Sequence, residues 1–208
     1  MIKREIIAVS AAASVTGLLS NATGSTWTLT ANDAGDMVTV NNGTTVPMAH
    51  LITIKGDAAT DHSAKTAVIT GTGPNGEVQT ETVNLPNGTA TVTSTKYFRS
   101  VQTVVPSATI GGDTMDIGWA LGSVSPSFNP QLARVSNFNF GFGCNVAAGS
   151  PTYTVQHSYD NGSTWFNHAS VAAETTSQEG TYTSPVEAVR LAFTAAGSVT
   201  LTGYQTEG

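Results

Sequence analysis

From Thr66 to Trp119 the sequence reads TAVITGTGPNGEVQTETVNLPNGTATVTSTKYFRSVQTVVPSATIGGDTMDIGW. Short runs of Thr, Val and Ile alternate here with Gly, Pro and Asn. Residues that branch at Cβ favour strands, and Asn-Gly between two such runs favours a tight hairpin turn. The stretch therefore predicts a β-meander, and none of its residues suggests a reactive centre.

Further runs outside this stretch alternate apolar and polar residues with the period of two expected for half-buried strands. They lie at residues 27–29, 38–40, 52–54, 138–142, 153–159, 189–193 and 199–201. Gly and Pro recur too often for a long helix. Residues 121–131 are rich in Pro, Ser and Gly and show no alternation, as is typical of a linker.

The chain is therefore expected to be all-β, with two β-sandwich-like domains joined by a Pro/Ser/Gly linker. We expect an N-terminal β-domain with an N-terminal arm over residues 1–120, the linker over 121–131, and a C-terminal β-sandwich over 132–208. The length of 208 residues allows each domain a core of its own.

Charged residues make up only 11% of the chain, against about 25% in an average soluble domain. The net charge is −6, and the eight Lys and Arg residues are scattered rather than clustered. Because nucleic-acid binding needs clustered cations, we expect no nucleic-acid partner. No apolar run approaches the roughly 18 residues of a membrane span, so no membrane partner is expected either.

The first strand-like run extends from Ile2 to Val9 and has apolar residues on both faces. Such a run suits a strand that is covered twice or one that pairs with another subunit. Ile2, Ile6 and Val9 are accordingly the candidate residues of an assembly arm. Removal of this segment as a signal peptide is not expected, because Glu5 interrupts a short apolar run.

Residues 158–165, Ser-Tyr-Asp-Asn-Gly-Ser-Thr-Trp, match the Asp-box pattern that recurs in sialidase propellers and other β-proteins. In the hairpin that this pattern predicts, Asp160 accepts backbone N–H bonds, Gly162 takes a positive φ and Trp165 covers the base. Ser158, Asp160, Gly162 and Trp165 are thus predicted to form a structural hairpin. Only one copy is present, and four Arg residues are too few for a sialidase site.

The residues of catalytic and metal chemistry show no productive spacing. His50, His62, His157 and His168 form no His-x-His or His-Glu-x-x-His pattern, and His157 is expected to be a hydrogen-bonded core residue. The loop with Asp57, Asp61 and His62 leaves a Ca²⁺ site open, although a solvated loop is favoured. Cys144 has no cationic neighbour in sequence and is expected to be a buried small residue.

No Ser-His-Asp or Cys-His set and no phosphate-binding Gly loop can be placed in the sequence. We therefore expect no catalytic residue, no metal, no cofactor and no enzymatic activity.

Aromatic residues supply the one alternative site. Exposed rings suit the C–H faces of sugars, and the candidates are Tyr97, Phe98, Trp119, Trp165 and Phe166. Most aromatic residues fall on inward faces, where core packing explains them. Tyr97 and Trp165 remain as possible glycan contacts.

Several turn-and-strand motifs resemble a known group of proteins. The runs are Trp27-Thr-Leu-Thr, Ile69-Thr-Gly-Thr-Gly-Pro-Asn-Gly with Gln79-Thr-Glu-Thr-Val, and Val92-Thr-Ser-Thr-Lys-Tyr-Phe-Arg-Ser-Val. They resemble a β-rich module common among virion structural proteins of tailed bacteriophages. Tyr153-Thr-Val-Gln-His, Pro185-Val-Glu-Ala-Val-Arg-Leu and Val199-Thr-Leu-Thr resemble the second half of the same proteins.

This resemblance implies a virion component, such as a capsid decoration (cement) protein or a tail or head-to-tail accessory protein. Its expected partners are further copies of itself and other virion proteins, such as the major capsid or tail proteins. The alternative function is a carbohydrate-binding module of a phage tail or surface appendage.

Overall fold

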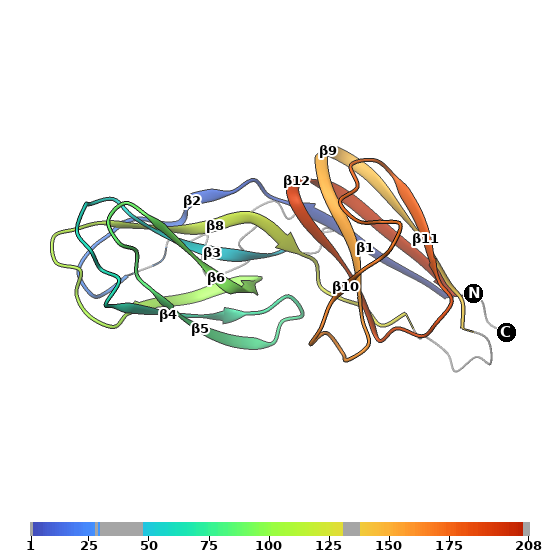
Figure 1. The fold of residues 1–208 in the computed structure, drawn as a ribbon, viewed down its shortest axis with the longest axis horizontal. Helices are drawn as coiled ribbons and strands as arrows, with labels where there is room; N and C mark the ends of the chain where they lie inside the picture. The colour runs from blue at the N-terminus through green and yellow to red at the C-terminus, as the bar shows by residue number, and fades with distance from the viewer. Residues whose placement is uncertain (1, 28, 30–47, 131–137, 206–208) are drawn as a thin grey trace. The chain divides into compact units, whose positions relative to one another are not determined.

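The computed structural model describes residues 2–27, 29, 48–130 and 138–205 (Figure 1). These residues form strands and loops, and no helix occurs among them, which confirms the all-β prediction. Within this part of the chain there is accordingly no helix long and apolar enough to cross a membrane. The expected strand at residues 38–40 lies outside the described residues.

Twelve strands are described, and their bounds follow in chain order: β1 Ile2–Ser10, β2 Ser14–Ala22, β3 Ala49–Gly56, β4 Thr66–Thr72, β5 Val78–Asn84, β6 Thr91–Phe98, β7 Ser100–Pro106, β8 Met115–Val124, β9 Phe140–Ser158, β10 Phe166–Asn167, β11 Gln178–Tyr182 and β12 Ala188–Gln205.

The strands fall into two compact units. The N-terminal unit contains the described residues of 12–29 and 49–123. The C-terminal unit contains residues 2–11, Met48 and the described residues of 124–205. Both units are built as sandwiches, so the prediction of two β-sandwich-like bodies is confirmed.

Two sheets face each other in the N-terminal unit. One has the order β2-β8-β3-β6, and the other has the order β5-β4-β7. Period-two alternation sends Ala67 and Ile69 of β4 inward, where they pack with Ile52 and Ile54 of β3 in one buried cluster. The core therefore lies between the two sheets, as burial of one face of each strand requires.

The central stretch is less simple than a meander. Its expected strands are present as β4 to β8, and β4 pairs with β5 in a hairpin whose turn contains Gly76 at φ 87°. After Pro86-Asn87-Gly88, however, the chain crosses to the other sheet, so β5 and β6 do not pair as neighbours. The alternation that identifies a strand does not identify its pairing partner, and this part of the prediction is corrected.

The C-terminal unit is built on two long strands. β9 and β12 pair along their whole length, from Ala188 opposite Ser158 to Gln205 opposite Phe140. The register shifts between Phe193 and Val199, and Gly149, at φ 74°, lies opposite this region. A side chain on Gly197 would overlap Pro151, so glycine is needed where the two strands approach each other closely.

These irregularities let each long strand contribute to both layers of the unit. One layer contains β1, the end of β12, the start of β9 and β11, whereas the other contains the start of β12, the end of β9 and β10. The layers pack together: Tyr182 of β11 contacts His157 near the end of β9, with ring centroids 5.1 Å apart. The runs at 189–193 and 199–201, expected as two strands, are one strand.

The N-terminal arm lies elsewhere than expected. β1 pairs with β12 of its own chain over nine positions, from Ile2 opposite Gln205 to Ser10 opposite Gly197. Ile6 is buried, and Val9 is half-buried. Residues 2–11 therefore belong to the C-terminal unit and not to the N-terminal domain, because the strand that pairs with β1 is provided by the same chain.

The expected linker also takes part in both units. Residues 121–124 complete β8, and Ser125 exchanges hydrogen bonds with Leu191 through its backbone N–H and its hydroxyl oxygen, both at 2.9 Å. Phe128 forms an isolated bridge with Val189. The boundary between the units thus falls at residues 123 and 124, and the Pro/Ser/Gly stretch comprises the end of β8 and a segment with one isolated bridge.

Candidate functional site

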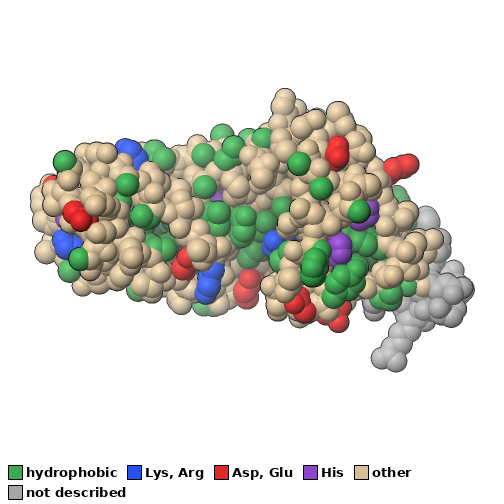
Figure 2. All heavy atoms as spheres, in the orientation of Figure 1, with side chains coloured by type: hydrophobic (Ala, Val, Ile, Leu, Met, Phe, Trp, Pro, Cys, Tyr) green, Lys and Arg blue, Asp and Glu red, His purple; other side chains and the backbone are tan. Residues whose placement is uncertain are grey.

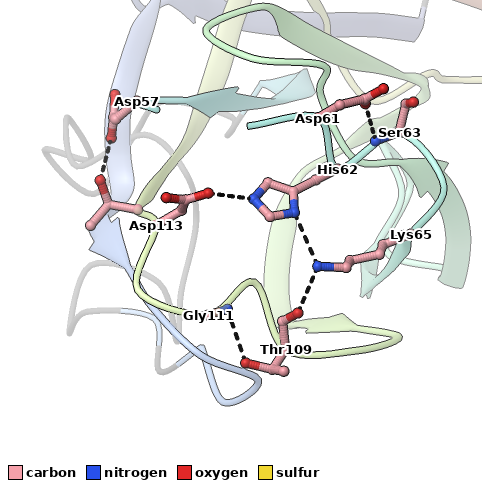
Figure 3. A network of polar contacts seen from close by, with 9 residues as sticks. Asp57, Asp61, His62, Ser63, Lys65, Thr109, Gly111 and Asp113 are labelled. Carbon is pink, nitrogen blue, oxygen red and sulfur yellow. Dashed lines mark hydrogen bonds and ion pairs between the residues drawn. The ribbon is translucent and has the colours of Figure 1, made fainter. Parts of the chain in front are cut away.

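A buried histidine joins two loops at one end of the N-terminal unit (Figure 3). The His62 Nε2 atom lies 2.9 Å from Asp113 Oδ2, and the Lys65 ammonium lies 3.0 Å from His62 Nδ1 and 2.8 Å from the Thr109 carbonyl oxygen. An ammonium can only donate, so Nδ1 accepts and Nε2 carries the proton that it donates to Asp113. Both ring nitrogens are therefore engaged.

These hydrogen bonds connect loop 57–65 to loop 107–114 and hold the two loops together. The His62 side chain is only 7% exposed, so a substrate has little access to it. Hydrogen bonds from Thr60 and from His62 hold the pKa of the Asp113 carboxyl below its usual value. A charged carboxylate and an ammonium on opposite sides of the imidazole suit a fixed structural contact rather than proton transfer.

The Ca²⁺ alternative placed at this loop finds no converging ligands. Asp61 accepts the backbone N–H of Ser63, and Asp57 binds Lys55 and the Thr114 hydroxyl, so the two carboxylates serve separate partners (Figure 3). Among the described residues no group of three His, Cys, Asp or Glu side chains could hold a metal ion.

The Asp-box residues lie in the turn after β9. The Asp160 carboxylate accepts the Thr164 N–H and the Ser158 hydroxyl, each at 2.7 Å, and the Ser158 oxygen accepts the Gly162 N–H at 2.8 Å. These bonds lower the pKa of Asp160 to about 2, with the Ser158 contribution the largest. Gly162 has φ 92°. The arrangement fixes the turn and leaves Asp160 no catalytic partner.

The two proposed glycan contacts are poorly exposed. Trp165 lies under the Arg190 guanidinium, whose central carbon is 3.9 Å from the ring centroid. Tyr97 is half-buried in β6, opposite Leu51. Arg190 thus covers one face of the Trp165 ring, and both rings are only partly exposed.

Of the other aromatic candidates, two pack in or against the core and one lies on the surface. Phe98 is fully buried, and Trp119 packs against the core while its Nε1 donates to the Ala12 carbonyl oxygen at 2.9 Å. By contrast, Phe166 is 49% exposed and Tyr159, which the sequence did not single out, is 53% exposed. The exposed rings thus lie at the base of the Asp-box hairpin.

These two rings surround His157, and we call His157, Tyr159 and Phe166 the aromatic cluster. The His157 centroid lies 5.2 Å from that of Tyr159 and 5.9 Å from that of Phe166. Figure 2 shows hydrophobic and histidine side chains gathered on the surface around β10. His157 lies on the inward face of β9, as predicted. Because β9 ends at the next residue, Ser158, the histidine is only half-buried.

Cys144 is buried on the inward face of β9, two residues after Phe142 on the same face. Burial raises the pKa of its thiol to about 12, so the thiolate required of a nucleophile is scarce at neutral pH.

None of the outward-facing residues of the three described strands β4, β5 and β7 is charged. These residues alternate with the buried ones and are Thr66, Val68, Thr70 and Thr72 of β4, Val78, Thr80, Thr82 and Asn84 of β5, and Ser100, Thr103 and Val105 of β7. Val68 and Val105 are cross-strand partners and are 39% and 52% exposed. We call this set the neutral face.

Comparisons with known proteins add little to this geometry. No protein-family model matches the chain, and no curated protein is significantly similar to it. A solved structure described as "Structure of allantoicase" is 10% identical, with a TM-score of 0.26 over 96% of this chain and 89% of that one.

Proposed function

We propose that the protein is a structural component of a tailed-bacteriophage virion, either a capsid decoration (cement) protein or a tail or head-to-tail accessory protein. It forms a homo-oligomer and binds other virion proteins, such as the major capsid or tail proteins. In this role it acts by surface contact, without a catalytic residue, metal or cofactor and without binding nucleic acid or membrane.

The observation that carries this proposal is the neutral face. Copies of a chain with net charge −6 repel one another at long range, and a contact free of charged groups avoids adding buried unpaired charges at short range. Thr and Val on a three-stranded sheet present short, stiff side chains that lose little entropy when they are covered. The face thus suits packing against a neighbouring copy or the particle surface.

Side chains bind backbone groups at the free edges of β5 and β6, so the packing is proposed to be face to face. Glu81 accepts the backbone N–H groups of Thr95 and Lys96, and the Lys96 ammonium donates to the Thr80 carbonyl oxygen at 2.8 Å. Such blocking of an edge prevents uncontrolled strand addition.

Strand addition by the N-terminal arm remains a separate part of the proposal. Because β1 already pairs with β12 of its own chain, a neighbouring copy would receive it only by strand exchange, in which β1 leaves one β12 and occupies the same place on another.

The test measures native mass by light scattering and then co-sedimentation with virus particles that lack the protein. Val105→Asp places a charge on the neutral face, and Val15→Asp makes the same change at a 42% exposed strand position elsewhere in the N-terminal unit. We expect a closed oligomer that sediments with the particles, and loss of this assembly only in Val105→Asp. A monomeric wild type that does not sediment with particles contradicts the proposal.

A further inference from the structure

The aromatic cluster is an exposed group of rings around one polar atom. Tyr159 and Phe166 are each about half exposed, and their centroids are 6.0 Å apart with planes tilted by 55°. The His157 ring stands at 84° to Tyr159 and at 29° to Phe166. Separations this small mean that the rings touch one another, so a ligand would lie across their outer faces and not between them.

The imidazole supplies the polar atom. His157 Nδ1 lies 3.3 Å from the Tyr182 hydroxyl, whereas Nε2 has no hydrogen-bond partner among the described residues. Burial, with a smaller contribution from His168, lowers the pKa of His157 and so favours the neutral ring. Depending on which nitrogen carries the proton, Nε2 either donates or accepts a hydrogen bond.

These features select one class of ligand. An anion would need a cation, and among the described residues the guanidinium placed over an aromatic ring, that of Arg190, lies on Trp165 and not on a ring of the cluster. A quaternary ammonium would stack on the rings but has no atom to pair with Nε2. A sugar has both an apolar C–H face for the rings and hydroxyl groups that donate and accept, and so it satisfies either form of the imidazole.

We propose that His157, Tyr159 and Phe166 form a saccharide-binding site, with C–H groups of one sugar ring against Tyr159 and Phe166 and a hydroxyl on His157 Nε2. This proposal replaces Tyr97 and Trp165 as glycan contacts with Tyr159 and Phe166, whose rings are more exposed to solvent. The Asp-box hairpin holds Tyr159 in place, because Ser158 and Asp160 on either side of it are fixed by hydrogen bonds. The inference does not depend on the virion role.

The test uses saturation-transfer difference NMR on the purified full chain with free glucose, galactose, N-acetylglucosamine and rhamnose as probes. Irradiation of the protein's aromatic protons is expected to transfer signal to the C–H protons of at least one sugar. Tyr159→Ala and Phe166→Ala should each weaken binding about tenfold. Tyr159→Phe keeps the ring and should keep the binding.

Tyr204→Ala is the matched control, because Tyr204 is a 40% exposed tyrosine of the same unit that lies opposite Lys3 and Gly141. Absence of signal with all four sugars, or an equal loss in Tyr204→Ala, overturns the proposal. So does a sugar-independent change of native mass in Tyr159→Ala, which would identify the cluster as a contact between copies. If Phe166→Ala fails to melt cooperatively, Tyr159→Ala alone decides, since its ring is the more exposed.

Discussion

Glu81 replaces backbone pairing between β5 and β6, and its removal should loosen the N-terminal unit. One carboxylate oxygen accepts the Thr95 N–H at 2.7 Å and the Thr95 hydroxyl at 2.9 Å, and the other accepts the Lys96 N–H at 2.8 Å. These three bonds connect the two sheets at an edge where the chain crosses without a hairpin. In Glu81→Ala all three donors lose their protein acceptor.

The expected size follows from the number and exposure of these bonds. An intramolecular hydrogen bond contributes about 0.5–1.5 kcal/mol net, and partly hydrated bonds lie toward the lower end. Three bonds together give about 2 kcal/mol for Glu81→Ala. For a cooperative unit of about 100 residues, 1 kcal/mol lowers the Tm by about 4–8 °C, so a loss of about 2 kcal/mol lowers it by about 8–16 °C.

Urea unfolding followed by circular dichroism measures the effect. The control is Glu77→Ala, which removes the same charge but only one local bond, from the Asn75 N–H at 3.0 Å. Glu81→Gln should be intermediate, because its amide N–H groups face the Lys96 N–H while the remaining oxygen still accepts from Thr95. A free energy of unfolding for Glu81→Ala that equals that of Glu77→Ala would refute the assigned role of Glu81.

Three further results are expected. Deletion of residues 1–10 removes a strand that buries Ile6, and should cost the C-terminal unit about 3 kcal/mol or more, measured by urea unfolding; unchanged stability with lost assembly would instead support an exchanged arm. The pKa of Asp160 is about 2 in the folded chain, below its ordinary 3.8, so the stabilisation from the hairpin bonds is fully present above pH 3.8 and is lost as the pH falls through about 2. The NMR signal of the Thr164 amide should follow this titration, and Asp160→Asn should abolish the titration. In Gly118→Ala the new Cβ overlaps the Ser14 carbonyl, which should detach β2 from β8 and cost about 3 kcal/mol in the same urea assay; native stability would contradict the close approach.

Alternation in the sequence was sufficient to place most strands. Ile52 and Ile54 in β3 and Tyr153 and Val155 in β9 point inward as their spacing predicts. Pairing was not predictable in the same way, because partners far apart in sequence leave no local signal. The crossing after Gly88 and the pairing of β1 with β12 depend on contacts of this kind, as does the single long strand formed by the two runs after Ala188.

The candidate site was predictable only in part. The Asp-box pattern identified the hairpin because its bonds are local, between residues two to four apart. Exposure of Tyr159 and Phe166 was not visible in the sequence, since it depends on where the sandwich layer ends. The alternation from Tyr153 to Tyr159 was the available signal, because it placed His157 and Tyr159 on one face at the end of β9.

The pairing of β1 with β12 also has a consequence for synthesis on the ribosome. Glu5 and Thr202 interact across 197 positions of sequence, so at 5–20 residues per second β1 waits roughly 10–40 s for its partner to be made. The N-terminal unit is complete before β12 is made, so it can fold while β1 still lacks its pairing partner. Translation speed and chaperone access should therefore affect the yield of this protein more than the stability of the finished fold does.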